Sequence, residues 1–136
     1  MEIEFLGKDS EDCPLIRIYG TDTAHFSSLH DEVLSLAQAA KRECLVNRIP
    51  GFYPVSGCTL AMFSSHDEGV QQMGRELKFS WTLSPIKWSI VAGLIEPFRY
   101  GPSEGTYQWL SGREARHGLD LPSISMLLSY SDDGRW

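Results

Sequence analysis

The sequence has few cysteines, no long apolar run and none of the short motifs that identify common enzymes. Its three cysteines, Cys13, Cys44 and Cys58, are far apart and include no CxxC pair, so a disulfide framework is not expected. The longest apolar stretch, 88–95, is far shorter than the roughly 20 residues that a membrane helix needs. No GxSxG, P-loop, GxGxxG or HExxH motif is present, which removes the simplest hydrolase, nucleotide-binding and zinc-protease assignments.

A basic and then apolar N-terminus, the mark of a signal peptide, is also absent. The chain instead begins MEIEFLGKD, where acidic and apolar residues alternate. We therefore expect a cytoplasmic protein without a membrane segment. At 136 residues, with 42% hydrophobic and 22% charged residues, the chain has the size and composition of a single globular domain, 1–136.

Positive charge is scarce in the first half of the chain. The net charge is −6, and residues 1–70 carry eleven acidic and five basic residues, whereas residues 71–136 carry seven of each. Within residues 1–12, Lys8 stands against five acidic residues: Glu2, Glu4, Asp9, Glu11 and Asp12. Such a negative field repels a phosphate backbone, so nucleic-acid binding is not expected, whereas a basic protein partner is favoured.

Hydrophobic periodicity predicts several strands. Alternating or continuous apolar residues indicate strands at 2–6, 14–19, 58–64, 76–83 and 123–130. The last is apolar on both faces, which favours a central place in the sheet. The first two are expected to pair as a hairpin, with Glu2 and Glu4 close to Arg17. The polar link between 58–64 and 76–83 is typical of a hairpin loop, and 105–111 fits either a strand or a helix.

Two segments predict helices. Apolar residues recur every three or four positions over 23–42, and Ser84-Pro85 is typical of a helix start, although a strand is the alternative there. We find no internal repeat. The expected fold is α+β: one domain with a mainly antiparallel sheet of about five to six strands and two helices packed on it.

Titratable residues form no convincing catalytic or metal set. His66, Asp67 and Glu68 are the densest local cluster, but neighbouring loop residues seldom converge on one point. The pair Asp132-Asp133 precedes Gly134 directly after a strand, a combination typical of a tight turn. His25 and His30 lie about 140° apart around the 23–42 helix and are expected at its surface or start. We therefore expect no metal and no cofactor.

Aromatic residues are plentiful after position 78. Trp81 and Trp88 lie on periodic apolar faces and are expected in the core. A smaller set of aromatic and basic side chains could line a ligand groove or anchor a partner: Trp109, Trp136, Arg113 and His117.

In size, acidity and lack of catalytic motifs, the chain resembles small bacterial α+β proteins that act by binding, including immunity proteins that neutralise toxins. This general resemblance implies a non-enzymatic protein-binding module, and the charge pattern places its partner-facing surface at the acidic N-terminal residues. The alternative is a small enzyme or small-molecule binder that uses the aromatic-rich second half. A cavity of several hundred Å³ with convergent polar groups favours the alternative, and a flat acidic face favours the binding module.

Overall fold

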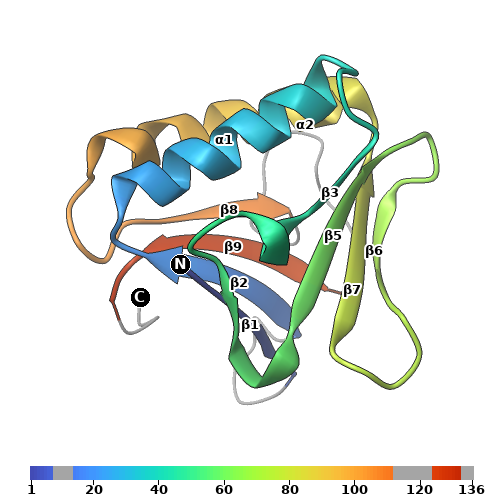
Figure 1. Cartoon of the computed structure of the whole chain (residues 1–136), viewed down its shortest axis with the longest axis horizontal. Helices are drawn as coiled ribbons and strands as arrows, with labels where there is room; N and C mark the ends of the chain where they lie inside the picture. Colours follow the sequence, from blue (N-terminus) through green and yellow to red (C-terminus); the bar gives the residue numbers. More distant parts are fainter. Residues whose placement is uncertain (8–13, 112–123, 133–136) are drawn as a thin grey trace.

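The described part of the chain forms two β-sheets, with two α-helices lying side by side against them (Figure 1). The computed structural model describes residues 1–7, 14–111 and 124–132. A hydrophobic core runs between the helices and both sheets. Within the described ranges, no helix is long and apolar enough to cross a membrane.

The larger sheet, sheet A, has the strand order β4-β1-β2-β9-β8. Its strands are β1 (Glu2–Leu6), β2 (Leu15–Gly20), β4 (Tyr53–Pro54), β8 (Tyr107–Ser111) and β9 (Ser125–Tyr130). The pairs β1–β2 and β8–β9 are antiparallel, whereas β2 and β9 are parallel over six residue pairs. The short strand β4 adds a second parallel pairing at the edge, beside β1.

The smaller sheet, sheet B, has the order β3-β5-β7-β6. Its strands are β3 (Glu43–Leu45), β5 (Thr59–Ser64), β6 (Gly69–Gln72) and β7 (Lys78–Leu83). The central strands β5 and β7 are parallel, and each has an antiparallel neighbour at the edge. Three short 3₁₀ helices join the regular elements: η1 (Val46–Arg48), η2 (Val55–Gly57) and η3 (Glu96–Tyr100).

The helices α1 (Thr23–Ala37) and α2 (Pro85–Ile95) each follow the last strand of a hairpin. The carboxylate of Asp22 caps α1 by accepting a hydrogen bond from the backbone N–H of Ala24 at 2.9 Å. In α2, Pro85 takes the first helical position, where its missing N–H costs nothing. Both helices bury one face against the core.

The two halves of the chain repeat one order of elements. The first half reads β1-β2-α1-β3-β5, with β4 inserted before β5, and the second reads β6-β7-α2-β8-β9. Sheet A combines the β1–β2 hairpin with β8–β9 of the second half, and sheet B combines the β6–β7 hairpin with β3 and β5 of the first. Each half therefore gives two strands to the sheet that contains the hairpin of the other half.

The packing follows the same repeat. Buried residues of α1 have counterparts 62 positions later in α2 and η3: Phe26, Leu29, His30, Val33 and Leu36 match Trp88, Val91, Ala92, Ile95 and Phe98. The backbone N–H of Ser131 donates to Gly20 at 3.0 Å, and that of Ser65 donates to Leu83 at 3.1 Å, at corresponding strand ends. The repeat is one of topology and burial, and the side chains of the two halves differ. Our expectation of no internal repeat is therefore wrong for the arrangement of the elements.

The expectation of an α+β fold with two helices is confirmed, but the single, mainly antiparallel sheet is wrong. Segments 58–64 and 76–83 contain β5 and β7, which lie in sheet B, parallel to each other. The link between them is no hairpin loop, because it contains β6. This edge strand is hard to recognise in the sequence, since Val70 is its only buried residue and Gln71 and Gln72 are exposed.

Other elements also differ from the expected ones or settle an open alternative. Helix α1 ends at Ala37 rather than near residue 42, and Ala39 adopts a positive φ of 59°, which a continuing helix does not allow. The segment 105–111, expected as a strand or a helix, contains a strand, β8. The central position of the last strand is confirmed, because β9 lies between β2 and β8.

Trp88 seats α2 on sheet B. It is fully buried, its ring centroid lies 4.7 Å from that of Trp81, and its Nε1–H donates to the Phe63 carbonyl at 2.9 Å. We expect Trp88→Phe to lower the free energy of unfolding by about 1–3 kcal/mol, because it leaves a cavity and an unpaired carbonyl. Ile86→Ala, at a side chain of the same helix that is 78% exposed, should change it by less than about 0.5 kcal/mol. Urea denaturation measures both, and equal stabilities would contradict the anchoring role.

Candidate functional site

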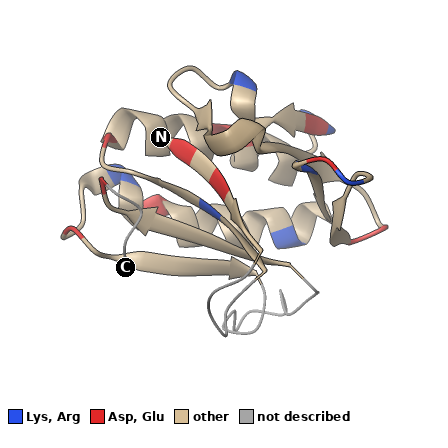
Figure 2. Cartoon of the chain, turned by 90° about the horizontal axis from the view of Figure 1, so that it is seen from below, with Lys and Arg blue, Asp and Glu red and all other residues tan. Residues whose placement is uncertain are grey.

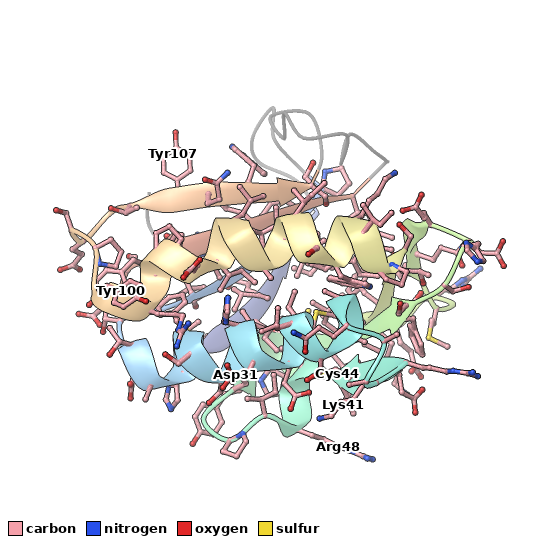
Figure 3. All side chains as sticks on the ribbon, turned by 90° about the horizontal axis from the view of Figure 1, so that it is seen from above. Asp31, Lys41, Cys44, Arg48, Tyr100 and Tyr107 are labelled. Atoms are coloured by element: carbon pink, nitrogen blue, oxygen red, sulfur yellow. The ribbon has the colours of Figure 1, made fainter. Side chains whose placement is uncertain are left out.

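Two surface cavities bring polar side chains together. The larger, which we call the α1–β3 groove, has a volume of about 660 Å³ and lies between α1, β3, η1 and β5. Figure 3 shows Asp31 on α1 and Lys41, Cys44 and Arg48 on the segment that follows it; the Arg48 side chain extends outward, away from α1. Apolar side chains also line the groove: Leu45, Ile49, Pro50, Ala61 and Phe63.

The charged residues of the groove are partly neutralised within the protein. The ammonium of Lys41 donates to both carboxylate oxygens of Glu32, at 2.8 and 3.0 Å. Burial, and then the neighbouring charge and hydrogen bond of Glu32, raise the pKa of the Cys44 thiol to about 12. Cys44 therefore stays protonated near neutral pH and is a poor nucleophile. The groove has the size of a ligand site but not the chemistry of a cysteine enzyme.

The smaller cavity, which we call the acidic cavity, has a volume of about 210 Å³ at one end of sheet A. Three carboxylates line it, and each comes from a different segment: Glu2 from β1, Asp22 from the β2–α1 turn and Asp132 from the residues after β9. No lysine or arginine is among the described residues that line this cavity. Figure 2 shows acidic residues beside the N-terminus, where β1 begins.

Neutral donors hold the three carboxylates in place. They are two hydroxyls and one backbone N–H: Tyr19 to Glu2 at 2.6 Å, Thr21 to Asp132 at 2.8 Å and Ala24 to Asp22 at 2.9 Å. Burial and the hydrogen bond to Glu2 raise the pKa of Tyr19 above its usual range, so its hydroxyl remains a donor. These contacts orient the negative charges without cancelling them.

Two of the described residues that line the acidic cavity carry positive or potentially positive groups, the Met1 ammonium and the His25 imidazole. The ammonium donates to the carbonyl of Gly51 at 2.9 Å. The Nε2 atom of His25 lies 3.7 Å from a carboxylate oxygen of Asp22, and the side chain is 28% exposed. Gly51 has a φ of 90°, and a Cβ atom there would lie 2.1 Å from His25 Nε2. A glycine therefore lets the backbone close against the imidazole.

The five N-terminal acidic candidates do not form one continuous site among the described residues. Glu2 lines the acidic cavity, whereas Glu4 accepts a hydrogen bond from Arg17 Nε at 2.8 Å, the cross-strand pairing expected from the sequence. The remaining three, Asp9, Glu11 and Asp12, lie outside the described residues. Sequence reasoning missed Asp22 and Asp132 as site residues, because each is local to a turn and only the tertiary fold brings them to Glu2.

Of the other candidate anchors, the structure describes Trp109, which lines neither cavity. Trp109 is only 9% exposed and packs with Leu15 and Leu127 in a second hydrophobic cluster, so its role is to pack against sheet A. The further candidates Trp136, Arg113 and His117 lie outside the described residues. Trp81 and Trp88 are buried, as expected.

The structure also places His30 and part of the 66–68 cluster. His30 is 7% exposed on α1, so the expectation that it lies at the surface is wrong. Of the 66–68 cluster, Glu68 turns to Lys87 and to the N–H of Ser84, at 3.0 and 3.2 Å. Within the described part of the chain, no group of three or more His, Cys, Asp or Glu is placed to hold a metal ion.

No protein-family model, curated protein or solved structure matches this chain. The internal repeat provides a comparison instead. Lys87 is the third residue of α2 as His25 is the third of α1, and its ammonium lies 3.0 Å from Glu68. Burial alone would raise the pKa of Glu68, but the hydrogen bonds from Lys87 and the Ser84 N–H lower it below its usual value. In the second half, the carboxylate near the helix start is therefore neutralised by a lysine of the same chain.

We expect Cys44 and Cys58 to resist alkylation in the folded protein, because burial raises their pKa values to about 12 and about 11. In a Cys13→Ser background, iodoacetamide at about pH 8 should label neither thiol until urea unfolds the chain, since the thiolate is the reactive form. Mass spectrometry locates the label. Native labelling of Cys44 as fast as in the unfolded chain would contradict a protonated, buried thiol.

Proposed function

We propose that this protein is a non-catalytic binding module whose acidic cavity receives a lysine or arginine side chain of a protein partner. The observation that supports this is the set of three oriented carboxylates, Glu2, Asp22 and Asp132, with no lysine or arginine among the described lining residues. At about 210 Å³, the cavity suits the end of one side chain. Pockets for drug-sized ligands are larger, roughly 300–1,000 Å³.

The contrast with other acidic residues strengthens the proposal. Glu4, Glu32 and Glu68 each face a basic side chain of the same chain and have little charge left for a partner. The carboxylates of the acidic cavity are held by neutral donors, so they need little reorganisation when a cation enters. The net charge of −6 would also steer a basic protein toward this surface.

The α1–β3 groove supports a second candidate function, the binding of a small molecule. Its volume of about 660 Å³ and its apolar lining are typical of ligand sites. Arg48, on its lining, forms no ion pair with another described residue and could meet an anionic group of the ligand. Such a ligand would use the first half of the chain rather than the aromatic-rich second half.

Charge-neutral variants test the acidic cavity. The double variant Glu2→Gln, Asp132→Asn keeps both hydrogen-bond acceptors and leaves the cap residue Asp22 unchanged. With a fluorescent, N-acetylated pentalysine amide as the probe, we expect its Kd at about 0.15 M salt to rise about fivefold or more, because two charge interactions are lost. Fluorescence anisotropy measures the Kd.

The matched control is Glu96→Gln, Glu104→Gln, which removes the same net charge at two exposed residues that line neither cavity. We expect this control to change the Kd by less than about twofold, since exposed charges outside the cavity are screened at this salt concentration. Equal losses in the two double variants would show that the peptide responds to the overall charge, and would overturn the proposed cavity. Circular dichroism confirms that both variants are folded.

A further inference from the structure

The site of His25 differs from its counterpart in the second half by the kind of positive group that it holds. Both His25 and Lys87 are the third residue of their helix, and both approach a carboxylate near the helix start, Asp22 at 3.7 Å and Glu68 at 3.0 Å. A lysine side chain is ordinarily a cation near neutral pH, whereas imidazole is the side chain whose charge ordinarily changes in this range.

We infer that protonation of His25 supplies the acidic cavity with an internal cation, so that the cavity binds an external basic side chain more weakly when His25 is protonated than when it is neutral. This inference rests on the proposed function of the cavity. In the neutral form, the three carboxylates remain available to the partner. In the protonated form, His25 is an internal cation beside the carboxylates, as Lys87 is beside Glu68 in the second half.

The groups around His25 determine the sign of the effect. Glu2 on β1, Asp22 at the start of its own helix and Asp132 after β9 are acidic. Among the described residues that line the cavity, Met1 supplies the other positive group, its ammonium. The neighbouring loop contributes Gly51 and Phe52, which carry no charge, and the Phe52 ring lies 6.0 Å from the imidazole. A positive charge on the imidazole therefore appears among three negative ones, where it competes with any further cation.

The imidazole is also held in position, so that its charge appears at one place. Gly51 closes against the Nε2 side, and Nδ1 is buried without a hydrogen-bond partner among the described residues. A proton on this imidazole and an external cation would both place positive charge beside the same carboxylates, so binding and protonation oppose each other.

The experiment measures the Kd of the acetylated pentalysine probe at about pH 5.5 and about pH 7. For the wild type, we expect binding about two- to fivefold weaker at the lower pH, the effect of one partly exposed charge pair. His25→Asn should lose most of this difference, although it keeps the Met1 ammonium, the carboxylates, His30 and His66. His25→Lys, which copies Lys87, should bind weakly at both pH values.

A second measurement needs no variant. Because the two events oppose each other, saturating probe should move the protonation of His25 to lower pH, as followed by NMR of its imidazole signals. Equal pH dependence in the wild type and His25→Asn, or no shift of the His25 titration, would overturn the inference but leave the cavity as a binding site. Wild-type binding at pH 7 that Glu2→Gln, Asp132→Asn does not weaken would overturn the proposed function itself.

Discussion

The parallel pairing of strands from different halves is the constraint on which the rest of the structure depends. β2 pairs with β9, and β5 pairs with β7, so the centre of each sheet joins the first half of the chain to the second. Parallel neighbours cannot be joined by a tight turn, and intervening elements must make the crossover. Neither sheet is complete until both halves are present, and the acidic cavity forms only because β9 brings Asp132 beside β2.

Local patterns were sufficient to predict most individual elements but not their partners. Alternation identified the β1–β2 hairpin and its Glu4–Arg17 contact, and Ser84-Pro85 identified the start of α2. The division into two sheets was not predictable in this way, because the register of β5 against β7 depends on contacts that neither strand encodes alone. The edge strand β6 escaped detection, since only one of its residues is buried.

The candidate site was predictable to a similar degree. Glu2 was among the acidic candidates, but charge counting placed Glu4 with it, although Arg17 neutralises Glu4 across the hairpin. Asp22 and Asp132 gave only local signals, a helix cap and a turn after a strand. A carboxylate keeps its charge available when its hydrogen-bond donor is neutral and is neutralised when the donor is basic. Which donor reaches it depends on the tertiary structure.

The internal repeat shows how little has to change for one backbone to present two different surfaces. In both helices the fourth residue is a buried aromatic, Phe26 in α1 and Trp88 in α2, and the corresponding strand ends make matching hydrogen bonds. The helices differ at the third helical residue, where Lys87 pairs with Glu68, whereas His25 lies in a cavity with three carboxylates and the Met1 ammonium. A lysine at this position closes the site to further cations near neutral pH. With a histidine there, the net charge of the site depends on pH and on whether an external cation is bound. One side chain at an equivalent position therefore distinguishes a structural ion pair from a candidate binding site.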